Sequence, residues 1–289
     1  MFVLGTAAFG FPYGIMNKVG SMSQKQVTNM VNIAYLSGIN EFDTAQMYHN
    51  SESYLGQAFE DLGIQKRVKV ITKLHPETYG TMDSVTKSIE DSTKRLRIPK
   101  LHGVLLHRER LLNHPYIMEM LNEIKNRGFM NNVGISVYLP EFALQAIRSN
   151  IVDIVQFPSC ILDRRFEKAG TFEFAKDRKK EIYLRNIFLQ GLLLTTSSSC
   201  HISAVKPELK KLDYLCKKFN LSRLEIVINY LKTIAPEAKL IFGAETQDQI
   251  KKCLDTTNYF LTKEMIDEIK RTFSNVQDEV LIPKLWRKN

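Results

Sequence analysis

The stretch Ile39-Asn40-Glu41-Phe42-Asp43 forms a short strand-like run that ends on an acidic residue, and the following loop contains Tyr48. The arrangement recurs twice: Val68-Lys69-Val70-Ile71-Thr72-Lys73 ends on a lysine, and Val104-Leu105-Leu106-His107 ends on a histidine. A helical pattern follows each run. In a parallel α/β barrel, the carboxyl ends of the strands meet on one face, where active sites lie. We therefore expect the acid, the phenol, the amine and the imidazole to meet in one pocket.

Strand-like runs alternate with amphipathic patterns along the whole sequence. The runs are Phe2–Leu4, Glu41–Asp43, Val68–Lys73, Gly103–Leu106, Asn132–Ser136, Ile151–Phe157, Ile182–Leu184 and Leu240–Phe242. Between the first two, the segment Val27–Ala34 places apolar residues at the i, i+3, i+4, i+7 spacing of a helix. This alternation predicts a parallel sheet. Eight strands close a (β/α)8 TIM barrel, which we favour over an open, doubly wound sheet.

No low-complexity linker divides the chain. We therefore expect residues 1–289 to form a single barrel domain, with residues 275–289 as a C-terminal tail. Candidate N-caps stand before the first, second and last helices, at Ser21 or Ser23, Asn50 and Thr262. The segment Arg185–Lys206 is long for a barrel connection, and long loops in compact domains tend to be functional.

The composition is that of a soluble globular protein, with 44% hydrophobic and 25% charged residues. No run of eighteen uncharged apolar residues is present, so we expect no membrane span. The N-terminus does not resemble a signal peptide. No pair of the four cysteines has metal-type spacing, so we expect no metal and a reducing, cytoplasmic location.

The formal net charge of +9 does not by itself identify a partner. The basic residues are not concentrated in one block, and the clusters Lys176–Lys180 and Lys210-Lys211 fit solvated helix faces. We therefore expect no nucleic acid partner. A positive field also attracts an anionic cofactor or substrate.

The four strand-end residues suit proton transfer to oxygen. A tyrosine hydroxyl has an ordinary pKa of about 10, and an ammonium beside it favours the phenolate and lowers that pKa. Burying the ammonium is costly unless a carboxylate pairs with it. We therefore predict that Asp43 holds Lys73, that Lys73 makes Tyr48 more acidic, and that His107 orients a substrate oxygen. Taken singly, each residue has a commoner structural explanation, such as a cap or a rim side chain. Their joint placement favours function.

The sequence resembles the aldo-keto reductase family in a series of short motifs that span nearly the whole chain. These are Leu4–Gly10, Gly38–Ala45 with Tyr48, Ser51-Glu52, Leu55-Gly56, Thr72-Lys73, Leu106-His107, Gly134–Ser136, Val155-Gln156, Gln190–Leu192 and Gly243-Ala244. The most specific is Asp43-Thr44-Ala45 with the tyrosine and Ser51-Glu52. The resemblance implies a (β/α)8 barrel that reduces carbonyls with NADPH. The segment Phe188–Gly191 resembles the corresponding segment of family members found with bacterial surface-polysaccharide enzymes.

The resemblance also implies roles for individual residues. Tyr48 would be the general acid, Asp43 and Lys73 its tuning pair, and His107 the group that orients the substrate. Gly5 and Thr6 match the loop beneath the nicotinamide, and Ser136 and Gln156 match the positions that hold the carboxamide. The loop along the pyrophosphate corresponds to Asn186, Phe188, Gln190 and Gly191, and the loop at the adenosine phosphate to Gly243, Ala244, Glu245, Thr246 and Gln249.

Several positions depart from the family pattern. Val137 and Cys253 replace frequent asparagines, and His49 replaces a glycine. Arg185 occupies the position of an aromatic residue that stacks on the nicotinamide, and its guanidinium can stack as well. Glu245 occupies a position that is often basic and reads the 2′-phosphate of NADP(H). A carboxylate there repels phosphate and can accept the hydroxyl of NAD(H), which keeps NAD(H) as an alternative cofactor.

The substrate is a small carbonyl compound by the same resemblance, with a sugar-derived aldehyde or ketone as one candidate. Aromatic residues that could wall the pocket are Phe9, Phe11, Tyr13 and Trp286. Arginines expected near the rim are Arg108, Arg110, Arg164 and Arg165. Because arginine recognises carboxylate and phosphate, an anionic substrate is a further candidate.

Two other classes of protein remain open from the sequence. One is a regulatory protein that holds the cofactor on a reductase scaffold with little turnover, which the departures at Val137 and Cys253 favour. The other is a metal-free lyase or isomerase in which Lys73 forms a Schiff base with the substrate. The expected pairing of this lysine with Asp43 speaks against it, since a charged ammonium is a poor nucleophile.

Overall fold

Parallel strands close into a barrel in the computed structural model, which describes residues 1–15, 20–78, 80–114, 116–256 and 259–286. The eight strands within these residues are β1 Phe2–Gly5, β2 Glu41–Asp43, β3 Lys69–Lys73, β4 Leu101–Leu106, β5 Met130–Ser136, β6 Ile154–Pro158, β7 Glu181–Arg185 and β8 Lys239–Gly243. They follow one another around the barrel in chain order, and β8 pairs with β1 to close the ring. The predicted (β/α)8 TIM barrel is confirmed.

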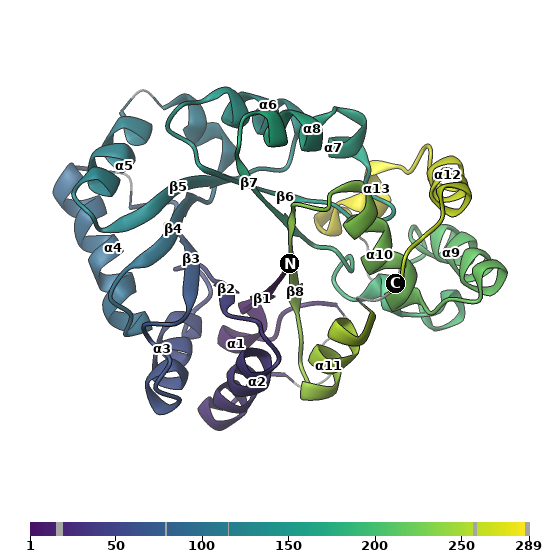
Figure 1. The fold of residues 1–289 in the computed structure, drawn as a ribbon, viewed down its shortest axis with the longest axis horizontal. Coiled ribbons are helices and arrows are strands. Elements are labelled where there is room, and N and C mark those ends of the chain that lie inside the picture. The colour runs from purple at the N-terminus through teal and green to yellow at the C-terminus, as the bar shows by residue number, and fades with distance from the viewer. Residues whose placement is uncertain (16–19, 79, 115, 257–258, 287–289) are drawn as a thin grey trace.

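Helices fill the connections and cover the outside of the barrel (Figure 1). The α-helices are α1 Ala7–Gly10, α2 Gln24–Leu36, α3 Ser51–Asp61, α4 Met82–Leu96, α5 Ile117–Asn126, α6 Pro140–Arg148, α7 Arg165–Lys168, α8 Thr171–Asp177, α9 Lys206–Phe219, α10 Arg223–Ile234, α11 Gln247–Asp255, α12 Lys263–Thr272 and α13 Asp278–Leu281. Short 3-10 helices are η1 Glu109–Asn113, η2 Leu192–Leu194, η3 Ser197–Ser199 and η5 Pro283–Leu285. Both η2 and η3 lie in the long segment after β7.

Side-chain caps fix the start of several helices. Ser23 caps α2 in a reciprocal capping box with Gln26, and this serine rather than the one two residues earlier is the cap. Thr262 accepts a hydrogen bond from the backbone N–H of Met265 at the start of α12. Asn50 precedes α3 as predicted but makes no side-chain capping bond. Each such cap stabilises a helix end by about 1 kcal/mol.

Apolar side chains fill the inside of the barrel. Val3, Ile71, Leu105, Ile154, Tyr183 and Ile241 form a buried cluster contributed by six strands. Glycine leaves room for them, since a Cβ added at Gly103 would lie 2.7 Å from Ile154 Cδ1. A larger cluster fills the layer between strands and helices, and includes the apolar face predicted for Val27–Ala34. The interior is therefore a packed core and not a channel.

A polar cluster closes the amino-terminal end of the barrel. Lys239, the first residue of β8, places its Nζ 2.7 Å from Glu181 Oε2 and 2.9 Å from Glu41 Oε2. The same ammonium donates to the hydroxyl of Tyr183 at 2.9 Å. Hydrogen bonding from His102 and from Lys239 lowers the pKa of Glu181 to about 2. We name these five residues the basal polar cluster.

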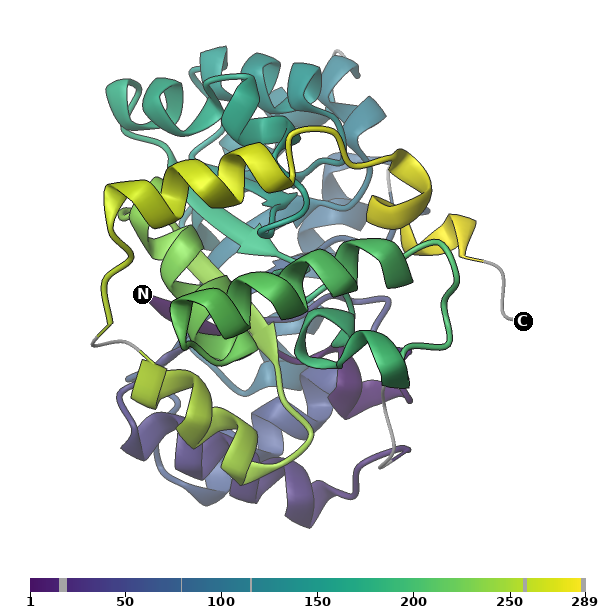
Figure 2. The ribbon, with the colours of Figure 1, turned by 90° about the vertical axis from the view of Figure 1, so that its right-hand side faces the viewer.

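The C-terminal part of the chain packs outside the barrel, where Figure 2 places α12 beside α9. Lys218 of α9 binds Glu268 of α12 at 2.7 Å, and Lys270 of α12 binds Glu167 of α7 at 2.6 Å. Trp286 donates from Nε1 to the carbonyl of Val280 at 3.2 Å, so it folds onto the preceding helix. None of the helices in the described residues is long and apolar enough to span a bilayer.

Candidate active site

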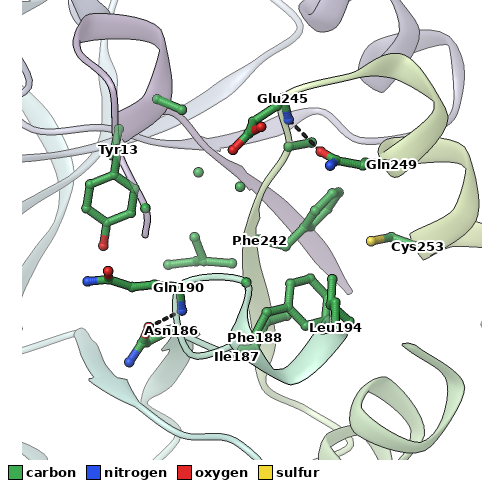
Figure 3. A pocket seen from close by; sticks show the side chains of 18 of the residues that line it. Tyr13, Asn186, Ile187, Phe188, Gln190, Leu194, Phe242, Glu245, Gln249 and Cys253 are labelled. Carbon is green, nitrogen blue, oxygen red and sulfur yellow. Dashed lines mark hydrogen bonds between the residues drawn. The ribbon is translucent and has the colours of Figure 1, made fainter. Parts of the chain in front are cut away.

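An elongated cavity of about 650 Å³ opens on the face where the strands end. One end lies at Asp43 and Tyr48, after β2, and the other at α11, near Cys253. Residues from the ends of β1, β7 and β8 line the length between them, and Figure 3 shows how the loop after β7 and the end of β8 enclose it. The cavity lies on the carboxyl-terminal face, where enzymes with this fold carry out their chemistry.

Most of the predicted cofactor residues line this cavity. They are Gly5, Thr6, Arg185, Asn186, Phe188, Gln190, Gly191, Gly243, Ala244, Glu245 and Gln249. Ser136, Gln156 and Thr246 do not line it. The hydroxyl of Thr246 instead accepts from the backbone N–H of Gln249 and caps α11. Ser136 and Gln156 stand next to residues that do line it, as their hydrogen bonds establish.

A buried ion pair joins the ends of β2 and β3. The Nζ of Lys73 lies 2.6 Å from Asp43 Oδ1 and donates a second hydrogen bond to the carbonyl of Thr44 at 3.0 Å. Gln156, at the middle of β6, donates from Nε2 to the same carboxylate oxygen at 2.8 Å. The side chains of Lys73 and Asp43 are only 2% and 6% exposed. This pair therefore depends on its own contacts and not on water for compensation of charge.

Tyr48 lies above this pair, with its ring centroid 5.4 Å from Lys73 Nζ. Its position depends on the close approach of α1. A Cβ added at Gly10 would lie 1.8 Å from the carbonyl oxygen of Tyr48, so only glycine fits there. Phe11 packs against the phenol ring at a centroid distance of 6.2 Å. His49 follows in the left-handed region, with φ +45°, which accounts for the glycine common at this position.

In this structure, burial outweighs the acidification of Tyr48 that the sequence predicts. Burial raises the pKa of the Tyr48 hydroxyl above its ordinary value, and the negative charge of Asp43 raises it further. The positive charge of Arg185 opposes these two effects but does not overcome them. The phenol is thus protonated throughout the physiological pH range.

His107 completes the predicted group of four. Its ring centroid lies 6.4 Å from that of Tyr48, at an interplanar angle of 85°. Burial lowers the pKa of the imidazole to about 3, and the positive charges of Lys73 and Arg185 add to this effect. The imidazole is therefore neutral at physiological pH. Its Nδ1 is buried without a hydrogen-bond partner in the described residues.

The loop after β7 has an unusual backbone. Asn186, Leu189, Gln190 and Gly191 all have φ between +49° and +90°. Left-handed conformations are costly for residues other than glycine, and the buried side chain of Leu189 helps to hold this one. Asn186 Oδ1 accepts from the backbone N–H of Gln190 at 3.2 Å (Figure 3). The backbone N–H groups of Leu189 and Gly191 also donate within the turn, to the carbonyls of Asn186 and Phe188, so the turn is held by its own hydrogen bonds.

Arg185 is fixed in the wall of the cavity. Its Nε donates to Ser136 Oγ at 3.2 Å, and its terminal nitrogen donates to the carbonyl of Val137 at 3.2 Å. The guanidinium stacks on the ring of Tyr138, with 4.1 Å from Cζ to the centroid. The side chain therefore bridges β7 to the end of β5, an attachment that sequence alone does not indicate.

At the outer end of the cavity, Glu245 and Gln249 are joined through the backbone N–H of Glu245, which donates to Gln249 Oε1 at 2.7 Å (Figure 3). Lys252 also lines the cavity and pairs with Asp248 at 2.7 Å. Sequence reasoning missed this lysine and several other lining residues, namely Leu194, Thr195, Ser222, Arg223 and Leu224. The capping box of Ser222 signals a helix start, but only the fold places it at the cavity.

Other expected pocket residues lie elsewhere. Of the aromatic candidates, Tyr13 lines the cavity, whereas Phe9 is buried in the core and Trp286 packs on its own tail. Arg164 binds Glu167 and the carbonyl of Lys270, and Arg165 binds Asp163. Arg108 and Arg110 are exposed near η1 and do not line the cavity. The prediction of a rim of arginines is therefore wrong for Arg164 and Arg165, because their charges are used in structural ion pairs.

The fold and the polar cluster at the strand ends define a barrel oxidoreductase, and the chain belongs to the aldo/keto reductase family, whose model matches residues 2–273. It is thus an oxidoreductase that interconverts carbonyl and alcohol groups. It is 24% identical over 259 residues to D-arabinose 1-dehydrogenase of Saccharomyces cerevisiae, a match that covers 81% of this chain and 77% of that protein. Over 121 residues it is 29% identical to 6-dehydroglucose reductase of Novosphingobium aromaticivorans, covering 37% of this chain and 40% of that protein.

Solved structures resemble the chain over almost its full length. Glycerol dehydrogenase from Gluconobacter oxydans superimposes with a TM-score of 0.76 at 19% identity, covering 95% of this chain and 91% of that one. An aldo-keto reductase from Klebsiella pneumoniae, solved in complex with NADPH, gives 0.73 at 18% identity, covering 95% and 92%. At this level of identity the likeness establishes the fold alone.

Proposed function

We propose that this protein reduces an aldehyde or ketone to an alcohol with a nicotinamide dinucleotide, with Tyr48 as the general acid. The observation that supports this most directly is the convergence of four polar residues: Asp43 and Tyr48 line one end of an elongated cavity, and Lys73 and His107 contact them from behind. The two relatives described above are named for sugar substrates, which makes a sugar-derived carbonyl a reasonable substrate class.

The residues present fit a nicotinamide dinucleotide. The buried Oε1 of Gln156 has no hydrogen-bond partner in the described residues, and a carboxamide N–H would supply one. A Cβ added at Gly243 would meet nothing within 4 Å, so the glycine leaves open space for a ligand at the end of β8. The side-chain amides of Asn186 and Gln190 lie along the cavity and supply polar groups for a pyrophosphate. When bound, a reduced nicotinamide supplies the hydride.

The side chains of this protein handle the proton. Because burial keeps the phenol of Tyr48 protonated, its hydroxyl is available to donate a proton to a carbonyl oxygen as negative charge develops there. The Lys73 ammonium lies near the ring and stabilises the phenolate left behind, while Asp43 holds that ammonium in place. Neutral His107 offers an N–H donor that orients the same oxygen. No metal ion is part of this proposal.

We further propose that the adenosine end of the site prefers NADH to NADPH, against the family expectation of NADP(H). The support is the carboxylate of Glu245 in the cavity wall and the pairing of Lys252 with Asp248, which reduces the positive charge available to a 2′-phosphate. Isothermal titration with both cofactors in parallel tests this. Tighter binding of NADPH would contradict it.

The Tyr48→Phe variant tests the proton donor. It should abolish carbonyl reduction and leave cofactor affinity within a few-fold, because only the hydroxyl is removed. Tyr214→Phe is a matched control, since Tyr214 is 60% exposed on α9, outside the cavity. Turnover that survives in Tyr48→Phe would show that the general acid has been misassigned. Cofactor binding without turnover in the unaltered protein, across a broad carbonyl panel, would favour the regulatory alternative.

The Schiff-base alternative has less support. Lys73 is 1% exposed, does not line the cavity, and uses two of its N–H groups on Asp43 and Thr44. A nucleophilic lysine must reach the substrate carbon with a free lone pair. Borohydride treatment in the presence of a carbonyl compound, followed by mass analysis, should therefore give no adduct at this residue.

A further inference from the structure

The wall of the cavity contains a positive charge that no acidic side chain neutralises. Among the described residues, no carboxylate lies within ion-pair distance of Arg185, although this guanidinium is partly buried. Asp43, the acidic residue at the reacting end of the cavity, is already bound by Lys73 and Gln156. A partly buried charge without a counter-ion is costly, so the site favours a ligand that brings one.

The guanidinium is also oriented and has donors to spare. Its bonds to Ser136 and Val137 use two of its five N–H groups, and the ring of Tyr138 holds its plane. The described residues accept no further hydrogen bond from it. Three N–H donors in a fixed planar arrangement match the paired oxygens of a carboxylate or phosphate.

The charge acts at the place where a carbonyl would react. Burial is the main cause of the low pKa of His107, and the charges of Lys73 and Arg185 follow. Burial likewise raises the pKa of Tyr13 to about 12, and the positive charge of Arg185 is the largest effect that opposes this shift. The guanidinium is therefore close enough to influence the groups around the reacting end of the cavity, which also holds Tyr48.

We propose that Arg185 binds an acidic group on the substrate, so that the preferred substrates are aldehydes or ketones bearing a carboxylate or a phosphate near the carbonyl. This inference rests on the proposed function and names the substrate class of the same site. Arg185 is then a specificity-determining residue that contacts the substrate, and the fork geometry of its donors makes lysine a poor replacement.

Matched substrate pairs test the proposal. 4-Carboxybenzaldehyde and 4-carbamoylbenzaldehyde have nearly the same shape and differ in charge, and glyceraldehyde 3-phosphate and glyceraldehyde form a second pair that tests phosphate. Hydrogen bonds to a charged group contribute about 1.5–3 kcal/mol, so the acidic member should have a kcat/KM roughly 10- to 100-fold higher. The ratio within each pair does not depend on the fraction of active protein, so it remains valid in a partly folded variant.

Variants assign the preference to this side chain. In Arg185→Gln, the ratio of kcat/KM between the acidic and the neutral substrate should fall close to one. In Arg185→Lys, this ratio should lie between that of the variant with glutamine and that of the unaltered protein, because lysine keeps the charge but lacks the planar, forked donors of arginine. Arg178→Gln is the matched control, because Arg178 is an exposed arginine stacked on Phe174 outside the cavity, and its loss should leave the ratio unchanged. A ratio near one in the unaltered protein for both pairs, or an unchanged ratio in Arg185→Gln, would overturn the inference and leave the proposed function intact.

A binding measurement separates the two proposals. Succinamate has a carboxylate and a non-reducible amide carbonyl, and butanamide is its neutral counterpart. Calorimetric titration should give roughly tenfold or greater preference for succinamate, lost in Arg185→Gln. If no carbonyl compound is reduced, the proposed function fails, and this titration alone then decides whether Arg185 is an anion site. Equal binding of the two amides would reject it.

Discussion

The buried histidine of the active site makes the stability of this protein depend on pH in a defined window. The pKa of His107 falls from an ordinary value of 6.5 to about 3 on folding. Between these values the unfolded chain binds more protons than the folded protein, so the free energy of unfolding decreases as the pH falls below 6.5. Stability is retained above that pH. From pH 7 to pH 5 the change from this one residue amounts to about 2 kcal/mol by linkage, and to about 1–2 kcal/mol after allowance for the partial exposure of the ring.

The substitution His107→Gln isolates this contribution, because glutamine keeps a polar group of similar size that does not titrate. Urea unfolding at pH 7 and pH 5 gives the loss of stability for each protein, and the loss should be smaller in the variant by about 1–2 kcal/mol. His201 is exposed, so His201→Gln serves as the control. From pH 7 to pH 5, the free energy of unfolding of this control should decrease by as much as that of the unaltered protein. Equal losses in the unaltered protein and His107→Gln would refute the reasoning, since the imidazole would then titrate alike in both states.

Three further predictions follow from contacts at the same site. Lys73→Met should lower the free energy of unfolding by about 3–5 kcal/mol, because it leaves the buried carboxylate of Asp43 unpaired. In the double variant Lys73→Met/Asp43→Leu, which also removes that carboxylate, urea titration should show that much of the lost stability is regained. Gly10→Ala should reduce turnover more than cofactor affinity in parallel kinetic and binding assays, since its Cβ would displace the backbone of Tyr48; unchanged kinetics would contradict this. Glu245→Arg should raise NADPH affinity relative to NADH by roughly tenfold or more in competitive titration, and an unchanged ratio would remove this residue from cofactor selection.

The fold could be predicted from the sequence because strand-like apolar runs and helical patterns of apolar residues occupy different segments of the chain. All the predicted strand-like runs became strands, with ends that moved by a few residues. The run Ile151–Phe157 became β6 Ile154–Pro158. The strand β6 begins later than predicted because Asp153 is held just before it. The carboxylate of Asp153 accepts hydrogen bonds from the backbone N–H of Val133 and from Nζ of Lys125. Such long-range hydrogen bonds leave no local pattern in the sequence.

The site was predictable where it depends on strand ends and unpredictable where it depends on packing. The positions of Asp43 and Lys73 follow from the topology of a parallel barrel. The direction of the pKa shift of Tyr48 does not, since burial and the charge of Asp43 raise this pKa while the charge of Arg185 lowers it. The attachment of Arg185 to Ser136 likewise joins segments 49 residues apart. Recognising an uncompensated guanidinium therefore required the arrangement in space.

The basal polar cluster has a consequence for the order of events in turnover. Together with the apolar side chains inside the barrel, Lys239 and its partners close the amino-terminal end, so that within the described residues no path leads through the barrel and both reactants use the face where the strands end. When two reactants share one face, the one that lies deeper in the cavity is expected to bind first and to leave last. A compulsory order of addition, visible as competitive product inhibition against only one of the two reactants, is the kinetic signature of that geometry.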